Sequence, residues 1–265
     1  MPTSIAITRK PSPALGDCVL EYLDRQEIDI AKAVRQHREY EAVLAELGLH
    51  VISLPAEAEL PDSMFVEDTA VVVEEVAVMT RMGAESRRGE VDSVAEALSE
   101  FRAVRRLCEP ATLEGGDVMR AGSTFFVGRS KRTNDAGIAQ LAAELGPYGY
   151  RLSAVEVRGC LHLKSACCYL GGGRILANPD WIDSAALAEF EILPVDADEP
   201  WAANILRIGD TVLIASSSPG TARILEKAGY RVRRLDISEL MKAEAGLTCS
   251  SLIFEADAPP SASSV

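Results

Sequence analysis

A cysteine near the C-terminus stands where a nucleophile would. Cys249 follows the glycine turn at Gly246 and precedes the apolar run 252–254, so a strand is expected to begin at this thiol. A thiol at the start of a strand lies at the mouth of a sheet, where a substrate can reach it. Buried packing is the alternative, since free cysteine is among the most buried residue types. Cys249 is therefore a candidate nucleophile that needs partners elsewhere in the chain.

One of the three histidines is suited to proton transfer. His162 stands at the entry of a strand expected to run from Leu161 through Tyr169, and an imidazole can protonate a leaving group and then activate water. Glu114 or Asp117, in a Glu-Gly-Gly-Asp segment, would orient this ring and raise its pKa. The alternatives are a hydrogen-bonded structural histidine and a simple glycine turn. His37 lies among charged residues of an expected helix and is interpreted as solvated.

Acids and arginines complete a pocket suited to a cationic amino acid. Glu67 and Asp68 are adjacent, so on a strand they point to opposite faces unless a bulge turns both inward. Carboxylates beside a cysteine suit a guanidinium, which is planar and presents its donors as a fork. Arg87 and Arg132 follow expected return strands, and each could bind a carboxylate. Surface solvation is the alternative for a single arginine.

These positions recur along the chain with a nearly constant spacing. Polar residues mark five expected strand entries, 47, 48, 42 and 45 residues apart: Glu67, Glu114, His162, Asn204 and Cys249. Hydrophobic periodicity predicts helices over residues 28–47, 91–101, 138–145, 181–190, 220–228 and 238–245. The repeat predicts an α/β fold, a pseudo-symmetric array or propeller-like closure of five strand-strand-helix-strand units around a central pocket. The N-terminal strand would pair with the last one.

Composition limits the kind of protein and its partners. The chain has 265 residues, of which 48% are hydrophobic, and we expect one catalytic domain over 1–255 with a disordered tail over 256–265. The net charge is −13 and basic runs are no longer than pairs, which argues against nucleic acid. No CxxC spacing, secretory leader or membrane-length apolar run is visible. We therefore expect a cytoplasmic protein with reduced thiols.

Five short motifs together carry a resemblance that spans residues 4–255. They are Asp-Ser-Met-Phe-Val-Glu-Asp at 62–68, Leu-Glu-Gly-Gly-Asp at 113–117, Ser-Lys-Arg-Thr-Asn at 130–134, His-Leu-Lys-Ser at 162–165 and Leu-Thr-Cys at 247–249. The chain resembles the dimethylarginine dimethylaminohydrolases, which are guanidino-group modifying enzymes with a five-bladed α/β-propeller fold.

The resemblance implies a role for each site residue. Cys249 would be the nucleophile, His162 the acid and base, and Glu114 the residue that orients His162. The implied substrate-binding residues are Glu67 and Asp68 at the guanidinium, Arg87 and Arg132 at the α-carboxylate, Asp62 with the carbonyls of Leu15 and Ala243 at the α-amino group, and also Phe65 and Glu244. Glu244 stands where the family more often has aspartate. Residues 16–27 are a candidate lid.

The implied reaction is hydrolysis of mono- and dimethylarginine to citrulline and methylamines through a covalent thiouronium intermediate. No metal or organic cofactor is expected, although zinc could occupy a Cys–His pair adventitiously. The expected partner is a small cationic amino acid, with no nucleic acid and no membrane, and the protein is expected to be a monomer or a homodimer.

Two other functions remain open. Arginine deiminase has an aspartate two residues after its histidine, whereas this chain has Lys164 there, which favours a methylated substrate. A non-catalytic binding protein of the same fold would have no reason to keep Cys249, His162 and Glu114 together.

Overall fold

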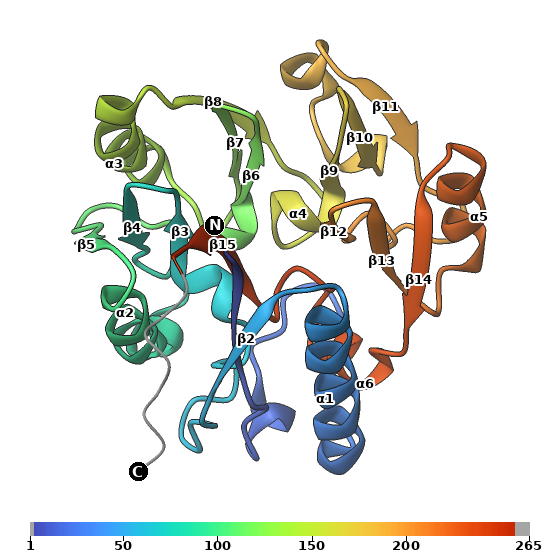
Figure 1. The fold of residues 1–265 in the computed structure, drawn as a ribbon, viewed down its shortest axis with the longest axis horizontal. Helices are drawn as coiled ribbons and strands as arrows, with labels where there is room; N and C mark the ends of the chain where they lie inside the picture. The colour runs from blue at the N-terminus through green and yellow to red at the C-terminus, as the bar shows by residue number, and fades with distance from the viewer. Residues whose placement is uncertain (1–2, 258–265) are drawn as a thin grey trace.

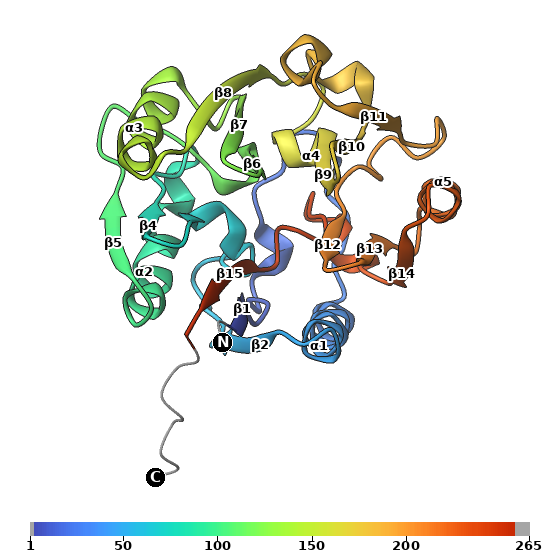
Figure 2. The ribbon, with the colours of Figure 1, turned by 45° about the horizontal axis from the view of Figure 1, so that its top comes forward.

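Five small sheets, each with three strands, make up the β structure of the part of the chain that the structure describes. The computed structural model describes residues 3–257, and in each sheet a pair of antiparallel strands is extended by a third, parallel strand. The sheets, each starting with the strand nearest the centre in Figure 2, are β15 (Leu252–Ala256), β1 (Thr3–Arg9), β2 (His50–Leu54); β3 (Ala70–Val72), β4 (Val76–Met79), β5 (Ala103–Arg106); β6 (Val118–Ala121), β7 (Thr124–Arg129), β8 (Arg151–Glu156); β9 (Cys167–Gly171), β10 (Arg174–Ala177), β11 (Glu191–Pro194); and β12 (Leu206–Ile208), β13 (Thr211–Ala215), β14 (Arg231–Leu235).

The parallel strands require a crossover, and helices supply it in four of the five sheets. The crossover helices are α1 (Ile30–Glu46), α2 (Val91–Ser99), α3 (Asp135–Leu145) and α5 (Pro219–Lys227). They lie outside sheets that surround a common centre (Figures 1 and 2). β15 pairs with β1, with Ile7 opposite Leu252, which confirms the expected pairing of the two ends of the chain. This mixed α/β architecture is compatible with a propeller-like fold.

The fourth crossover differs from the expected helix over 181–190. It consists of two 3-10 turns, Pro179–Trp181 and Ser184–Leu187. The side chains of Asn178 and Asp183 accept hydrogen bonds from backbone amides two residues further on. Such local bonds compete with an α-helix and explain why the apolar pattern alone was misleading here.

The polar strand entries lie in turns that precede the inner strands. Glu67 and Asp68 belong to the 3-10 turn Val66–Thr69, and Glu114 precedes a second such turn, Gly115–Asp117. His162 is the N-cap of the four-residue helix α4 (Leu163–Ala166). The strands predicted to start at these residues therefore begin three to five residues later. A Cβ on Gly115 would collide with the carbonyl oxygen of Glu67, so glycine is required where the two turns meet.

Helix α1 packs against the core along one face and buries a histidine that was expected to be solvated. His37 is 1% exposed, and its Nδ1 lies 3.7 Å from the carboxylate of Glu41. Burial lowers the pKa of His37. The prediction was wrong because the charged neighbours in sequence lie on the outer face, whereas His37 shares the inner face with Tyr40 and Leu44.

The last helix ends earlier than its sequence suggested. Helix α6 spans Ser238–Met241, whereas periodicity predicted residues 238–245. Glu244 has a φ of 58°, the left-handed region that is costly for a residue with a side chain, and it marks the bend after the helix. This bend leads the chain toward Cys249.

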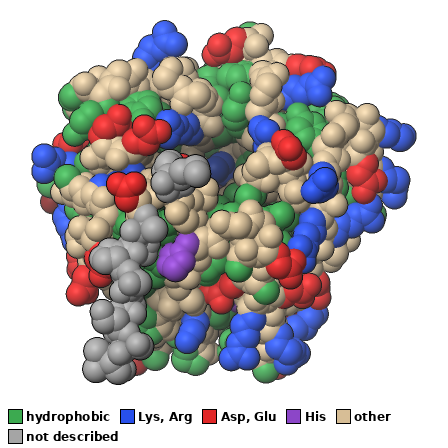
Figure 3. Space-filling view, viewed as in Figure 1, with side chains coloured by type: hydrophobic (Ala, Val, Ile, Leu, Met, Phe, Trp, Pro, Cys, Tyr) green, Lys and Arg blue, Asp and Glu red, His purple; other side chains and the backbone are tan. Residues whose placement is uncertain are grey.

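The ends and the surface add three observations. Ala256 still belongs to β15, and the predicted tail beyond Asp257 lies outside the described residues. Within residues 3–257 no helix has the length and apolar character needed to cross a membrane. Figure 3 shows acidic and basic side chains interspersed on the face viewed, with a hollow near its middle.

Candidate active site

His162 and Glu114 form a buried pair at the centre of the candidate site. The Nε2 atom of His162 donates to Glu114 Oε2 at 2.8 Å, and both side chains are at most 5% exposed. Glu114 also accepts hydrogen bonds from the amides of Gly83 and Ala84 at 3.0 and 3.2 Å. These amides fix the carboxylate, which in turn orients the imidazole. Of the two acids proposed for this role, Glu114 is the one that contacts the ring.

Asp117 positions the neighbouring backbone instead. Its Oδ1 accepts from the amide of Leu163 at 2.9 Å, and its Oδ2 accepts from Ser130 and Thr133 at 2.6 and 2.7 Å. Asp117 therefore links the turn before β6 to the residue that follows His162.

Asp68 faces the other nitrogen of the same imidazole. Asp68 Oδ1 lies 3.9 Å from His162 Nδ1 and accepts from the amide of Gly116 at 2.9 Å. Its Oδ2 accepts from Arg87 at 2.8 Å. Burial alone would lower the pKa of His162, but the acids around it, Asp68, Glu114 and Asp117, raise that pKa to about 9. His162 is thus protonated at neutral pH and can act as an acid.

The pKa of Glu114 moves the other way. Burial would raise it, but the hydrogen bond from His162 and the charges of His162, Arg87 and Arg132 hold the pKa of Glu114 well below its usual range. Asp68, Glu114 and His162 also offer three possible metal-ligand atoms within 4.8 Å of one another. Arg87 and Arg132 already pair with these acids, so the cluster is balanced by protein cations.

Cys249 lies in the turn before β15 rather than at the start of that strand. Its Sγ accepts from the amide of Gly246 at 3.4 Å, and its carbonyl accepts from the amide of Glu67 at 3.2 Å. Burial, Glu67 and Asp68 raise the pKa of the thiol to about 12, and the Gly246 amide and Lys164 oppose this rise. The half-buried Cys249 packs against an apolar cluster that contains Leu15, Phe65 and Ala243.

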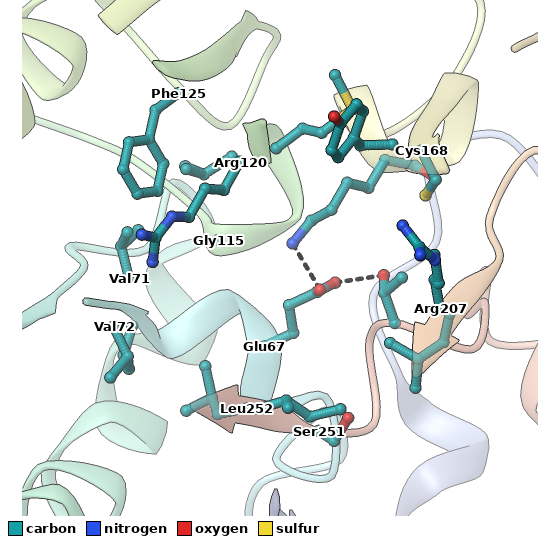
Figure 4. Close-up of a pocket in the computed structure, with 18 of the residues that line it drawn as sticks. Glu67, Val71, Val72, Gly115, Arg120, Phe125, Cys168, Arg207, Ser251 and Leu252 are labelled. Atoms are coloured by element: carbon teal, nitrogen blue, oxygen red, sulfur yellow. Dashed lines mark hydrogen bonds and ion pairs between the residues drawn. The ribbon is translucent and has the colours of Figure 1, made fainter. Parts of the chain in front are cut away.

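Glu67 points toward different partners from its neighbour Asp68. Its Oε1 accepts from Lys164 at 2.5 Å and its Oε2 accepts from Thr248 at 2.6 Å. The two acids diverge as expected, although they do so from a 3-10 turn and not from a strand. Figure 4 shows the carboxylate of Glu67 between these partners at the wall of a cavity of ≈ 300 Å³. Glu67 and Lys164 line this cavity, whereas His162, Glu114 and Cys249 do not.

Arg132 is held between two acids. Its Nη1 donates to Glu114 at 3.1 Å, and its Nε donates to Glu21 at 2.6 Å. Arg87 is also buried and donates to Asp68, to Glu90 and to the carbonyl of Phe65. Both arginines that were expected at the α-carboxylate therefore lie in the site.

The candidate lid, residues 16–27, is attached to the site by acceptors on two loops. Glu244 Oε1 accepts from the amides of Glu21, Tyr22 and Leu23 at 2.9, 2.6 and 2.7 Å. Asp62 accepts from the amide of Val19 at 3.1 Å. Leu15 is buried, and its carbonyl accepts from Cys18 within the same segment. Asp62 and Glu244 thus hold the candidate lid in this structure.

Sequence reasoning missed three residues that contact this network. Glu21 lies in a segment without periodicity, so nothing in its spacing indicated that it would meet Arg132. Thr248 was part of the Leu-Thr-Cys motif but had no role of its own. Tyr40 appeared only as one residue of a helix, although its hydroxyl meets Ser251 and the carbonyl of Leu247.

Comparisons with known proteins agree on one family. The model of the family described as N,N dimethylarginine dimethylhydrolase, eukaryotic, matches residues 17–189. The chain is 39% identical to the N(G),N(G)-dimethylarginine dimethylaminohydrolase of Streptomyces coelicolor, with 95% of this chain and 97% of the relative covered. It is 36% identical to the protein of the same name from Pseudomonas aeruginosa, with 94% and 98% covered.

A solved structure extends the similarity to the fold. A cysteine-to-serine mutant of the Pseudomonas aeruginosa protein, complexed with citrulline, superposes with a TM-score of 0.89 at 34% identity, covering 96% of this chain and 100% of that one. The family model, the sequence relatives and the structural likeness all support the resemblance carried by the five motifs. The chain belongs to the dimethylarginine dimethylaminohydrolase family.

Proposed function

We propose that this protein hydrolyses Nω-methylated arginine to citrulline and a methylamine. The observation that carries the proposal is the buried His162–Glu114 pair, with a contact of 2.8 Å and a raised histidine pKa. A protonated imidazole fixed in this way can donate a proton to a departing amine. The similarity to enzymes named for dimethylarginine supports the choice of substrate.

In the proposed first step the sulfur of Cys249 attacks the guanidinium carbon. The thiol has a raised pKa partly because Glu67 and Asp68 are negative. A bound guanidinium would offset these charges and favour the thiolate, whose proton leaves to solvent. The bond between the carbon and the methylated nitrogen then breaks, and His162 gives that nitrogen its proton. A thiouronium joined to Cys249 remains.

In the proposed second step water replaces the sulfur. Neutral His162 takes a proton from water as the oxygen attacks the same carbon. The carbon–sulfur bond breaks, the second proton of the water passes to solvent as citrulline forms, and the thiolate of Cys249 and the protonated His162 are restored. Dividing the displacement into two steps is the advantage of covalent catalysis. The adduct of a histidine-to-glycine dimethylarginine dimethylaminohydrolase with S-methyl-L-thiocitrulline, 34% identical in sequence, supports this route.

The amino-acid end of the substrate would bind between the arginines and the lid. We assign the α-carboxylate to Arg132, with the charge of Arg87 behind it, and the α-amino group to Asp62 and the carbonyls of Leu15 and Ala243. In this arrangement the α-carboxylate replaces Glu21 on Arg132. Phe65 and Glu244 would complete the wall, and the five sheets would form a closed five-bladed propeller around the pocket.

Formation of citrulline from three substrates tests the proposal. We expect kcat/KM for dimethylarginine or monomethylarginine to be at least about tenfold above that for arginine, about 1.4 kcal/mol in the transition state. The reason is Lys164, which pairs with Glu67 where the deiminase pattern has an acid for unsubstituted nitrogen. Arginine as the best substrate would favour the deiminase instead, and no citrulline from any substrate would favour a binding protein.

A further inference from the structure

The turn that carries Cys249 is held from two sides by residues that have no role in the proposed chemistry. On one side stands Tyr40 of helix α1, which is 1% exposed. Its hydroxyl donates to the carbonyl of Leu247 at 3.0 Å and lies 2.7 Å from the hydroxyl of Ser251. Leu247 and Ser251 are the residues two before and two after Cys249. One hydroxyl therefore spans the base of the nucleophile turn.

On the other side the same turn rests on the side chain of Asn204. The Oδ1 of Asn204 accepts from the amide of Thr248 at 3.0 Å, and its Nδ2 donates to Thr248 Oγ1 at 3.2 Å. A Cβ on Gly246 would collide with the amide group of Asn204, so backbone and side chain are in direct contact there. Asn204 occupies the fourth strand entry of the repeat, equivalent to Glu67, Glu114, His162 and Cys249.

The bonds of Asn204 continue into the buried ion pair of the site. Thr248 accepts from Asn204 and donates its own hydroxyl hydrogen to Glu67, and Lys164 donates to the other oxygen of Glu67. Hydrogen bonds aligned in this way polarise one another and resist rearrangement. The turn is consequently fixed to the 3-10 turn of Glu67 as well as to helix α1.

These hydrogen bonds matter because they fix the position of a backbone amide that contacts the sulfur of Cys249. The amide of Gly246 lies 3.4 Å from Cys249 Sγ and is one of the groups that lower the pKa of this thiol, against burial and two acids that raise it. The direction in which a backbone N–H group points depends on how firmly the turn around it is held. Gly246 has no side chain of its own to fix its direction, so its neighbours in space must do so.

We infer that Tyr40 and Asn204 are positioning residues that hold the turn from Gly246 to Ser251 so that the Gly246 amide points at the sulfur of Cys249. Neither residue meets the substrate in the proposed function. Their removal should leave the binding groups Arg132 and Asp62 unchanged and should weaken the nucleophile. The inference thus deepens the proposed function, but its effect on the thiol exists without any substrate.

The first test measures alkylation of the thiol by iodoacetamide as a function of pH. In Tyr40→Phe and in Asn204→Ala we expect the alkylation rate of Cys249 to fall about tenfold below wild type at a given pH, and its pH profile to shift upward. Exposed Cys108 serves as the internal reference, and its rate should not change. Trypsin cleaves after Lys242 and after Arg106, so Cys249 and Cys108 lie in different peptides that mass spectrometry distinguishes.

The second test compares turnover with a matched hydroxyl deletion. Both variants should lower kcat about tenfold and change KM less than about twofold, since about 1.4 kcal/mol is lost from the transition state alone. Tyr150→Phe removes a hydroxyl that donates to Glu75 at an exposed site, and it should match wild type. Ser251→Ala removes only one of the two Tyr40 contacts and should give a smaller loss; it carries the test if Tyr40→Phe does not fold.

Two results would overturn the inference. The first is that Tyr40→Phe and Asn204→Ala fold and show wild-type alkylation of Cys249 and wild-type kcat, even if their melting temperatures fall. If Tyr40→Phe misfolds, Ser251→Ala takes its place in this comparison. The other is a tenfold rise in KM at constant kcat. If the wild-type protein turns over no methylarginine, the proposed function fails while the alkylation rates still decide the inference.

Discussion

Glu21 and Arg132 are joined by an ion pair of 2.6 Å between the candidate lid and the site. Arg132 is the arginine that we assign to the substrate's α-carboxylate. In this structure the carboxylate of Glu21 accepts from Arg132 instead. In the proposed binding mode the substrate and the candidate lid would compete for this one cation. Glu244 holds the same stretch of the candidate lid through three backbone amides.

Glu21→Gln should therefore lower KM for methylarginine. A partly exposed ion pair contributes about 0.2–1 kcal/mol, which corresponds to a decrease of about 1.4- to fivefold. Asp24→Asn removes the same charge from the same segment and should leave KM unchanged. Steady-state kinetics of the two variants decides the matter, and a higher KM in Glu21→Gln would show that its ion pair assists binding.

Arg132→Ala should raise KM for methylarginine by about 10- to 150-fold, because a charge-assisted hydrogen bond contributes about 1.5–3 kcal/mol. Arg87→Ala should act in the same direction. The comparison substrate is methylguanidine, which has no α-carboxylate and should be much less affected. Equal losses on both substrates would mean that these arginines serve only to hold Asp68 and Glu114.

The raised pKa of His162 predicts how stability depends on pH. The folded pKa is about 9 and the ordinary value is 6.5, so the folded state binds this proton more tightly. The resulting stability is fully present below pH 6.5 and is lost as pH rises through about 9. Its upper bound is about 3 kcal/mol for a shift of this size.

Denaturant unfolding of wild type and His162→Asn over this window isolates the effect. Subtracting the two curves removes contributions that both proteins share, such as that of Glu90, whose pKa is raised to about 7. The difference between wild type and the variant should shrink with increasing pH. A difference that stays constant would indicate that His162 does not hold its proton in the way described.

The repeat of polar residues at strand entries was enough to predict five similar units and to bring Glu114 and His162 together. The turns before the inner strands were not predictable from the same pattern. Val66 and its apolar neighbours have the composition of a strand, and only the approach of Gly115 to the Glu67 carbonyl shows why the chain turns there. The ion pair of Glu21 with Arg132 joins residues 111 positions apart, beyond the reach of any local pattern.

The Cys249→Ser variant tests the central claim most directly. With dimethylarginine as substrate and the fold verified by circular dichroism, we predict that citrulline formation is abolished, because a hydroxyl in this turn lacks a base strong enough to ionise it. Retention of more than about a few per cent of wild-type kcat would contradict the account, since Cys249 would then not be the nucleophile.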